Sequence, residues 1–399
     1  MTATDVEGEV AQESGPLIFV IAGEPSGDVL GARLMAALKA ERRGAVRFAG
    51  IGGEEMTREG LRSLFPIQEF AVMGFLEVLP HVFHIIRRIR QTAAAVRAQH
   101  PDIVVTIDSP SFTLEVQQRL KDAGMPLVHY VAPQVWAWKA KRAKRMARYL
   151  DAVLALLPFE PPLFEAHGLR ARFVGHSAVE DAAGEEARLA DRPSPSGEGP
   201  LLAVLPGSRK GEVRKLLPVF EATVAALARK HPGLRVVIPT VETVDAAVRE
   251  ATASWPVPVE VTRGVTAKRR AFARAQAAIA ASGTVALELA VAAVPTVIAY
   301  RLGGFTGLLP FSWLNVPYAS LVNILAGRMV QPELLQRDCR PEKILGPIDR
   351  LLSDPAARLA QREAYLEVIR ALQPASGESP SRCAARAVLS LLADKEKGA

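Results

Sequence analysis

Three short polar segments of the chain hold residues whose types and spacing could do chemistry. Residues 22–28, 106–112 and 205–213 each follow an apolar, strand-like run and precede a helical pattern. A loop between a strand and a helix directs backbone N–H groups and the positive end of the helix dipole toward an anionic ligand. Open α/β sheets bind ligands at the carboxyl edge of their strands, so these loops predict a ligand-binding cleft between two sheets.

The first loop, Ala22-Gly-Glu-Pro-Ser-Gly-Asp28, has two interpretations. In the first, Glu24, Ser26 and Gly27 contact a substrate, because a carboxylate at the mouth of a strand needs a hydroxyl or a cation as its partner. In the second, the loop is an ordinary turn in which its glycines meet a backbone requirement and Asp28 caps the following helix. Both stay open, and the carboxylate of Glu24 favours the first.

Asp108 is the candidate for general acid–base chemistry. It ends the apolar strand expected at 103–107, where partial burial would raise the pKa of its carboxyl toward that of a useful general base. The alternative is that Asp108 or Ser109 caps the helix expected at 112–120. A single aspartate does not decide between a base and a cap.

The third loop, Leu205-Pro-Gly-Ser-Arg209, suits a diphosphate. Gly207 allows close backbone approach, Ser208 offers a hydroxyl, and Arg209 places a fixed cation at the start of a helix. The alternative is a capped helix that carries a solvated arginine.

A related loop at 281–288 could hold the sugar of a nucleotide. Ser282, Gly283 and Thr284 repeat the pattern of small and hydroxyl residues, and Glu288 follows about one turn into the helix. Its carboxylate could accept hydrogen bonds from two vicinal hydroxyls, such as those of a ribose. The alternative is that Glu288 pairs with a lysine or an arginine.

Residues 65–90 combine many apolar side chains with a cationic end, Arg87-Arg88-Ile89-Arg90. The segment is apolar on too many sides for a simple surface helix. Core packing accounts for part of this pattern, and contact with an acyl chain or a membrane surface would account for the rest. The candidate membrane-contacting or acyl-contacting residues are Phe70, Met73, Phe75, Leu76, Val82, Phe83, Arg87 and Arg88.

Trp136 and Trp138 precede a basic run at 139–148. Such a run is usually a solvated helix face. The two tryptophans could belong to the core, form a sugar platform or anchor an interface.

The composition favours two α/β domains. The chain has 399 residues, 49% of them hydrophobic and 6% aromatic, which suits helices packed on sheets. Its net charge of +7 favours an anionic partner and leaves nucleotide, membrane surface and nucleic acid open. The two cysteines have no metal-ligand spacing and favour a reducing cytoplasm. The longest apolar stretch, 277–300, contains Glu288 and Pro295, and therefore predicts a strand–helix–strand unit rather than a bilayer span.

Strand-like runs alternate with helical patterns in both halves, which is typical of doubly wound parallel sheets. The expected strands are 17–22, 46–50, 103–107, 127–131, 152–157 and 172–174, then 201–205, 236–239, 259–262, 277–280 and 296–300. The expected organisation is a disordered tail (1–15), a Rossmann-like domain (16–176), a linker rich in Pro, Ser and Gly (177–200), a second Rossmann-like domain (201–354) and C-terminal helices (355–399) that could cross back to the first domain.

Taken together, these segments resemble the lipid-A-disaccharide synthase family of bacterial glycosyltransferases. The matching segments follow the family's order from about residue 17 to about residue 340. They are 22–28, 71–74 with 77–79, 107–110, 129–133, 135–138, 157–160, 175–176, 205–209, 282–284 with Glu288, 323–328 and 332–336.

The resemblance implies the B-type glycosyltransferase fold, with two Rossmann-like domains facing a cleft. It implies inverting transfer from UDP-2,3-diacylglucosamine to 2,3-diacylglucosamine 1-phosphate through a β-1,6 bond, with release of UDP. In this comparison Asp108 matches a catalytic candidate, while Arg209, Glu288 and Asn323 match nucleotide or phosphate contacts and Glu24 a substrate contact.

Some properties are expected from the residues and the resemblance together. Neither an Asp-x-Asp pair nor a Walker loop occurs, so no metal site and no cofactor are expected. The expected location is the cytoplasm, peripheral on the inner face of the inner membrane. Nucleic acid is not an expected partner, and a homodimer stays open.

One position departs from the family pattern and leaves rival functions in view. After Ile107-Asp-Ser-Pro110, many members have a second aspartate, whereas this chain has Ser111-Phe-Thr113. A mechanism that needs the second carboxylate is therefore in doubt, and Asp108 is left to act alone. The rivals are a UDP-sugar 2-epimerase of the same two-domain plan and a nucleic-acid-binding protein that uses the basic run. Neither explains the apolar residues at 65–86.

Overall fold

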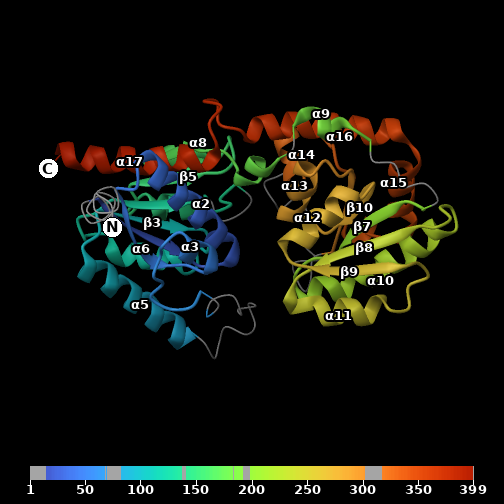
Figure 1. The fold of residues 1–399 in the computed structure, drawn as a ribbon, viewed down its shortest axis with the longest axis horizontal. Helices are drawn as coiled ribbons and strands as arrows, with labels where there is room; N and C mark the ends of the chain where they lie inside the picture. Colours follow the sequence, from blue (N-terminus) through green and yellow to red (C-terminus); the bar gives the residue numbers. More distant parts are fainter. Residues whose placement is uncertain are drawn as a thin grey trace, which may run out of the picture. The chain divides into compact units, whose positions relative to one another are not determined.

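The computed structural model describes residues 15–67, 69, 82–136, 141–182, 184–191, 198–301 and 317–398. The chain separates into two compact units. The first consists of Met1–Glu180 and Leu372–Ala399, and the second of Asp181–Ala371. Each unit has its own parallel sheet with helices on both faces (Figure 1).

The sheet of the first unit is parallel throughout its described strands. The strands are β1 (Leu17–Ala22), β2 (Arg47–Ile51), β3 (Ile103–Ile107), β4 (Leu127–Tyr130), β5 (Ala152–Ala155) and β6 (Arg170–Phe173), in the order β2-β1-β3-β4-β5-β6. β1 and β3 are apolar apart from Thr106 and are buried on both faces, as strands covered by helices on each side must be.

Helices from both ends of the chain cover one face of this sheet. The helices α2 (Pro25–Glu41) and α17 (Pro380–Gly398) pack together on it, and Leu38 and Val388 join the same core cluster as Val20 and Val105. The C-terminal helix therefore belongs to the first unit, alongside α2 (Figure 1).

The other face of the first sheet is covered by helices from the middle of the unit. These are α5 (Val82–Gln99), α6 (Thr113–Leu120), α7 (Lys141–Met146) and α8 (Pro161–Glu165). Val96, Leu114, Met146 and Phe164 are buried there against strand residues such as Phe19. The short helix α3 (Glu54–Arg58) follows β2, and a 3-10 turn spans Ser177–Asp181.

The second unit has a similar sheet. Its strands are β7 (Leu201–Leu205), β8 (Arg235–Thr240), β9 (Val259–Arg263), β10 (Ala277–Ala280), β11 (Thr296–Tyr300) and β12 (Glu333–Leu335), in the order β12-β11-β10-β7-β8-β9. Its helices are α9 (Glu185–Leu189), α10 (Lys210–Ala228), α11 (Glu242–Thr252), α12 (Val265–Arg274), α13 (Thr284–Val291), α14 (Leu321–Ala326), α15 (Pro341–Ser353) and α16 (Pro355–Leu372), with a 3-10 turn at Gln336–Asp338.

Among the described strands, each sheet has one point where the chain reverses the direction in which it adds strands. In the first unit this point lies between β1 and β3, and in the second between β7 and β10. Ligands of open α/β sheets bind beside the carboxyl ends of the strands at such a point. The loops at 22–28 and 106–112 therefore flank one switch point, and those at 205–209 and 281–284 flank the other.

The predicted α/β class of two doubly wound parallel sheets is confirmed. The apolar stretch at 277–300 folds as β10, α13 and β11, as predicted. The prediction missed β12, a three-residue edge strand that contains Glu333. Among the described residues, no helix is both long and apolar enough to cross a membrane.

Candidate active site

The two loops at the switch point of the first unit are in direct contact. Gly23 follows β1 and packs on Ser109, which follows β3. A Cβ atom added to Gly23 would lie 2.4 Å from the Cβ of Ser109 and 2.6 Å from its Oγ. Contacts this short do not occur between real side chains, so glycine is required for the two loops to meet.

Asp108 is half-buried at this edge and is not a helix cap. Its Oδ1 accepts a hydrogen bond from the N–H of Ser109 at 2.7 Å. The helix α6 has no side-chain cap, so the capping alternative is wrong for Asp108. Burial raises the pKa of the Asp108 carboxyl, and the Ser109 N–H opposes part of this rise. A raised pKa is what a general base at neutral pH needs.

The backbone is strained at the same place. Asp108, Ser109 and Val131 have φ values of 51°, 46° and 76°, in the left-handed region that non-glycine residues rarely adopt. The Asp108 N–H donates to the Tyr130 carbonyl at 3.0 Å, so the strained residues follow neighbouring strands. Strain of this kind persists where the surroundings enforce it, and it clusters at functional sites.

In the loop at 22–28, Glu24 and Ser26 are exposed and Gly27 is buried. The alternative that Asp28 caps its own helix is wrong. The carboxylate of Asp28 accepts hydrogen bonds from the N–H groups of Gly53, Glu55 and Met56 at 2.7, 3.0 and 3.1 Å. Asp28 therefore caps α3 and joins the turn after β2 to the start of α2.

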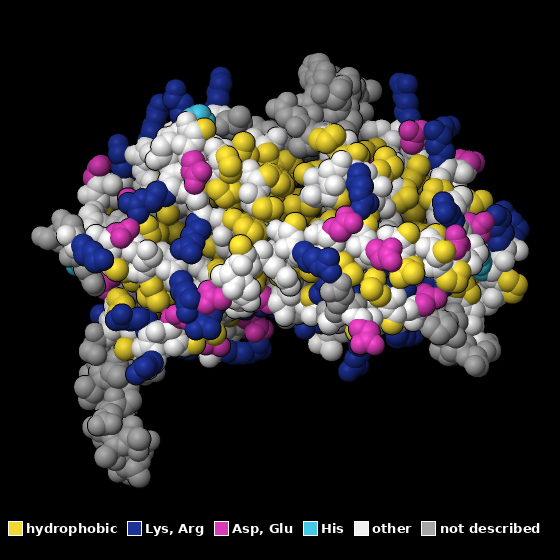
Figure 2. Space-filling view, turned by 90° about the horizontal axis from the view of Figure 1, so that it is seen from above, with side chains coloured by type: hydrophobic (Ala, Val, Ile, Leu, Met, Phe, Trp, Pro, Cys, Tyr) yellow, Lys and Arg dark blue, Asp and Glu magenta, His cyan; other side chains and the backbone are white. Residues whose placement is uncertain are grey.

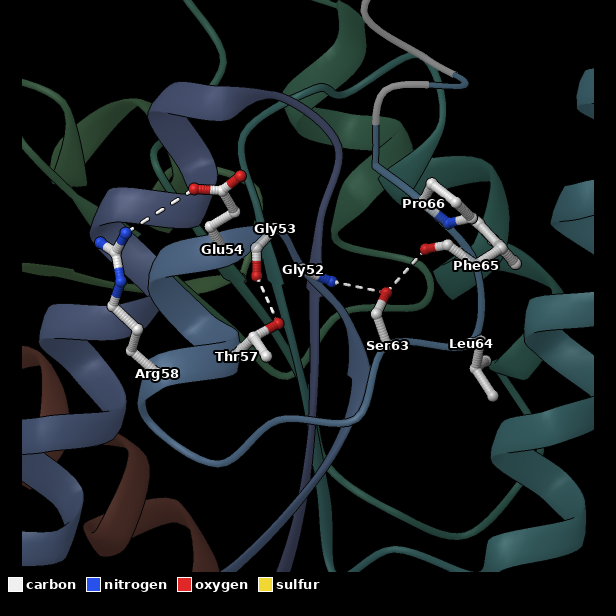
Figure 3. Close-up of a pocket in the computed structure, with 9 residues that line it drawn as sticks. All are labelled: Gly52, Gly53, Glu54, Thr57, Arg58, Ser63, Leu64, Phe65 and Pro66. Atoms are coloured by element: carbon white, nitrogen blue, oxygen red, sulfur yellow. Dashed lines mark hydrogen bonds and ion pairs between the residues drawn. The ribbon is translucent and has the colours of Figure 1, made fainter.

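A cavity of about 660 Å³ opens beside this turn (Figure 3). One side is polar: the Ser63 hydroxyl accepts from the Gly52 N–H at 3.2 Å and donates to the Phe65 carbonyl at 2.7 Å. The other side is formed by Leu64, Phe65 and Pro66. The Arg88 guanidinium lies 4.5 Å from the centre of the Phe65 ring.

The candidate diphosphate loop of the second unit already holds an internal carboxylate. Gly207 has a φ of 103°, which favours glycine. Glu212 accepts long hydrogen bonds, of 3.3 and 3.4 Å, from the N–H groups of Ser208 and Arg209. Its other oxygen accepts from the Tyr300 hydroxyl at 3.0 Å. The side chain of Arg209 is 82% exposed.

The second candidate loop lies beside the first, because β10 pairs with β7 and the Ala281 N–H donates to the Leu205 carbonyl at 2.8 Å. Gly283 and Thr284 are exposed, and the Ser282 hydroxyl donates to the Ala319 carbonyl at 3.0 Å. Glu288 forms an ion pair with Lys268 at 2.5 Å, which is the alternative that its sequence context left open.

Asn323 is fully buried and its amide is fully used within the protein. Its Nδ2 donates to the Gln331 carbonyl and to Glu333 at 2.8 and 2.7 Å, and its Oδ1 accepts two N–H groups, from Val330 and Gln331, at 2.8 Å each. No polar capacity is left for a nucleotide. Asn323 therefore holds the turn before β12 in place in this conformation.

The candidate membrane segment is described in part. Phe70, Met73, Phe75 and Leu76 lie outside the described residues, as does the side chain of Val82. Phe83 is 85% exposed at the start of α5. Arg87 is exposed, whereas Arg88 is half-buried and pairs with Glu69 at 2.7 Å. Figure 2 shows Lys and Arg side chains interspersed with acidic and hydrophobic ones on the surface.

Sequence reasoning assigned no role to one buried carboxyl, that of Glu160. Glu160 follows β5, is 2% exposed, and accepts a hydrogen bond from Trp136 Nε1 at 3.2 Å. Burial raises the pKa of Glu160 to about 7. The position of Glu160 after a buried strand could have indicated it from the sequence. Its hydrogen bond with Trp136, 24 residues away, could not be inferred in that way.

Comparison with known proteins gives a consistent result. Residues 18–388 match the family model described as lipid-A-disaccharide synthetase. The chain is 51% identical to the lipid-A-disaccharide synthase of Rhodospirillum centenum, with 94% of each chain covered. It is 49% identical to that of Paramagnetospirillum magneticum, with 94% of this chain and 97% of the relative covered.

Solved structures are similar in fold at low sequence identity. The UDP co-structure of Staphylococcus aureus MnaA has a TM-score of 0.65 at 13% identity, covering 94% of this chain and 97% of that one. Acinetobacter baumannii MurG has a TM-score of 0.59 at 14% identity, covering 94% and 100%.

Proposed function

Because this chain belongs to the lipid-A-disaccharide synthetase family, we propose that it joins UDP-2,3-diacylglucosamine to 2,3-diacylglucosamine 1-phosphate. The chain is a glycosyltransferase of lipid A disaccharide formation with the GT-B fold. The match over residues 18–388 carries this conclusion. The proposed bond is β-1,6, formed with inversion and release of UDP.

In this proposal, the second unit binds the UDP-sugar at the switch point between β7 and β10. The diphosphate contacts Gly207, Ser208 and Arg209 at the start of α10, where the helix dipole favours an anion. It displaces Glu212 from its long hydrogen bonds with the loop N–H groups. The exposed Arg209 supplies the positive charge that the departing UDP needs.

The ribose is assigned to the loop at 282–284 together with Glu288. Two vicinal hydroxyls can donate to the Glu288 carboxylate while Lys268 remains its ion-pair partner. Asn323 supports this site indirectly. Its amide donates to Glu333, which also accepts hydrogen bonds from the Ala319 and Ser320 N–H groups. In this assignment Asn323 positions the loop and makes no contact with the nucleotide.

Asp108 is proposed as the general base. Inversion by direct displacement needs one base to take the proton of the acceptor's 6-hydroxyl, and it needs no covalent nucleophile. The half-buried carboxyl and its raised pKa suit that role. Ser111 stands where many relatives have a second aspartate, so Asp108 acts without a second carboxylate from that position.

The acceptor is assigned to the first unit, beside Glu24, Ser26 and Gly27. The cavity next to α3 suits an amphiphile, because Ser63 and Thr57 line one side and Leu64, Phe65 and Pro66 the other. The amide or ester group that attaches an acyl chain can contact the polar side while the chain contacts the apolar side. We assign the segment at 65–90 to the acyl chains or the membrane, with the protein peripheral on the inner face of the inner membrane.

The test is a reconstituted reaction. Purified protein is incubated with UDP-2,3-diacylglucosamine, with and without 2,3-diacylglucosamine 1-phosphate, and the products are identified by mass spectrometry. UDP and a tetra-acylated disaccharide phosphate are expected when both substrates are present. Conversion of the UDP-sugar without an acceptor would instead indicate an epimerase, and no turnover with both substrates would overturn the proposal.

A further inference from the structure

Glu160 joins two loops at the carboxyl edge of the first sheet. Its Oε1 accepts from the indole N–H of Trp136 at 3.2 Å, and its Oε2 accepts from the backbone N–H of Leu157 at 3.1 Å. Trp136 belongs to the loop after β4, and Glu160 follows β5. Because the carboxyl is 2% exposed, solvent competes little for either hydrogen bond.

The indole of Trp136 is held on one side and half-buried as a whole. The Phe159 ring meets it edge-on, with the ring centres 5.6 Å apart and the planes at 85°. Its polar N–H donates to the buried Glu160 carboxyl, so the rest of the indole is apolar ring surface. An aromatic ring in this state offers a flat apolar surface at low conformational cost.

The loop that carries Trp136 begins next to Asp108. Val131, its first residue, has a φ of 76°, and its N–H donates to the Leu154 carbonyl at 3.0 Å. The preceding residue, Tyr130, accepts the N–H of Asp108 at 3.0 Å. The proposed base and the tryptophan loop are thus fixed to the same strand end.

Packing alone does not explain a carboxyl at this position. Burying a carboxyl that has no cationic partner costs stability, and an apolar residue would fill the space without that cost. No charged side chain in the described part of the chain contributes to the pKa of Glu160; burial raises it, and the N–H groups of Leu157, Trp136 and Leu156 oppose the rise. The carboxyl therefore serves to accept hydrogen bonds from these N–H groups.

We propose that Trp136 is the platform on which the apolar face of the acceptor sugar stacks, and that Glu160 is the positioning residue that fixes its indole. This inference rests on the proposed function, since it names a contact for the acceptor of that reaction. It adds a specificity contact to the site that holds Asp108.

The kinetic test compares Trp136→Leu, Trp136→Phe and Glu160→Gln. Trp136→Leu removes the ring and is expected to raise the acceptor KM about tenfold, equivalent to about 1.4 kcal/mol. The donor KM is expected to stay within twofold, because the donor is assigned to the other unit. Trp136→Phe keeps a smaller ring and is expected to give an intermediate acceptor KM. Glu160→Gln is expected to raise the acceptor KM less than Trp136→Leu does.

A spectroscopic readout separates positioning from general structural support. The protein is labelled with 5-fluorotryptophan, and its ¹⁹F signal from position 136 is assigned as the one lost in Trp136→Phe. This signal is expected to shift on acceptor binding and to titrate with a midpoint near 7, the pKa of Glu160. In Glu160→Gln, the titration is expected to disappear.

Two outcomes would overturn the inference. One is an unchanged acceptor KM in a folded Trp136→Leu protein, or in Trp136→Phe if the Leu variant does not fold. The other is a position-136 signal that ignores both the acceptor and Glu160→Gln. If the wild-type protein makes no disaccharide, the proposed function fails instead, and the pH titration of the signal still tests the link between Glu160 and Trp136.

Discussion

Gly23 and Ser109 lie so close that a Cβ on Gly23 would stand 2.4 Å from the Cβ of Ser109. We therefore expect Gly23→Ala to push the strained turn at 108–109 away from β1 and to displace the Asp108 carboxylate. Turnover should fall by about 10–100-fold, as is typical when a reacting group moves by about 1 Å. UDP affinity should be unchanged, because the nucleotide is assigned to the other unit.

The matched control for this change is Gly346→Ala. A Cβ at Gly346, within α15, meets nothing within 4 Å. Normal turnover in Gly346→Ala and reduced turnover in Gly23→Ala would support the argument. Normal turnover in a folded Gly23→Ala protein would show that the turn yields without moving Asp108.

Asp108→Asn should lower kcat by roughly 10²–10⁴-fold with UDP affinity retained, because the amide has nearly the same shape and is not a base. Since burial raises the pKa of Asp108, the wild-type rate should fall as the pH drops through a value above that of an ordinary aspartate. The residual rate of the variant should lack this acidic limb. A pH–rate profile of both proteins is the measurement, and near-normal turnover in the variant would place the base elsewhere.

The strand bounds show how much of the fold could be predicted from the sequence. The bounds of β3, β7, β10 and β11 agree with the expected ones, because polar residues or proline lie at or within two residues of the ends of these apolar runs. β12 was missed because three residues give no period and the first of them is the charged Glu333.

The roles of buried polar residues could not be predicted in the same way. Asp28 caps a helix that begins 26 residues later, and Glu160 meets Trp136 across 24 residues. Asn323 matched a family motif, yet its amide is used up by the protein. Side-chain partners of this kind depend on tertiary packing, which local patterns do not contain.

Arg209→Ala and Glu288→Ala should both weaken UDP binding. Losing a charge-assisted hydrogen bond, to phosphate for Arg209 or to ribose for Glu288, costs about 1.5–3 kcal/mol, which corresponds to roughly 10–150-fold in Kd. Lys268→Ala should have a smaller effect, because it removes the ion-pair partner of Glu288 and leaves the carboxylate that is assigned to the ribose. Isothermal titration with UDP is the measurement. Unchanged affinity in both Arg209→Ala and Glu288→Ala would remove the nucleotide site from these loops.

Glu160 should make the stability of the first unit depend on pH. Its pKa is raised from 4.5 to about 7 by burial, so the folded state binds the proton more tightly than the unfolded state does. The stability present below pH 4.5 should be lost progressively as the pH rises through about 7. Between pH 5 and 8, the wild-type protein should lose on the order of 2 kcal/mol more than Glu160→Gln. Hydrogen exchange of β4 and β5 amides measures this difference, and parallel profiles in the two proteins would contradict it.

Phe83→Asp should reduce binding to anionic vesicles. Phe83 is 85% exposed at the start of α5. Exposure of a large aromatic side chain to water is unfavourable, and its transfer into an acyl phase lowers the free energy. Arg87 lies one turn further along and could meet lipid phosphates, so a carboxylate at position 83 should lose apolar contact and add repulsion.

Met329→Asp is the control, because Met329 is 59% exposed in the second unit. Flotation with anionic vesicles should show reduced binding for Phe83→Asp and wild-type binding for Met329→Asp. Equal flotation of all three proteins, with activity on acylated substrates intact, would make Phe83 an ordinary surface residue.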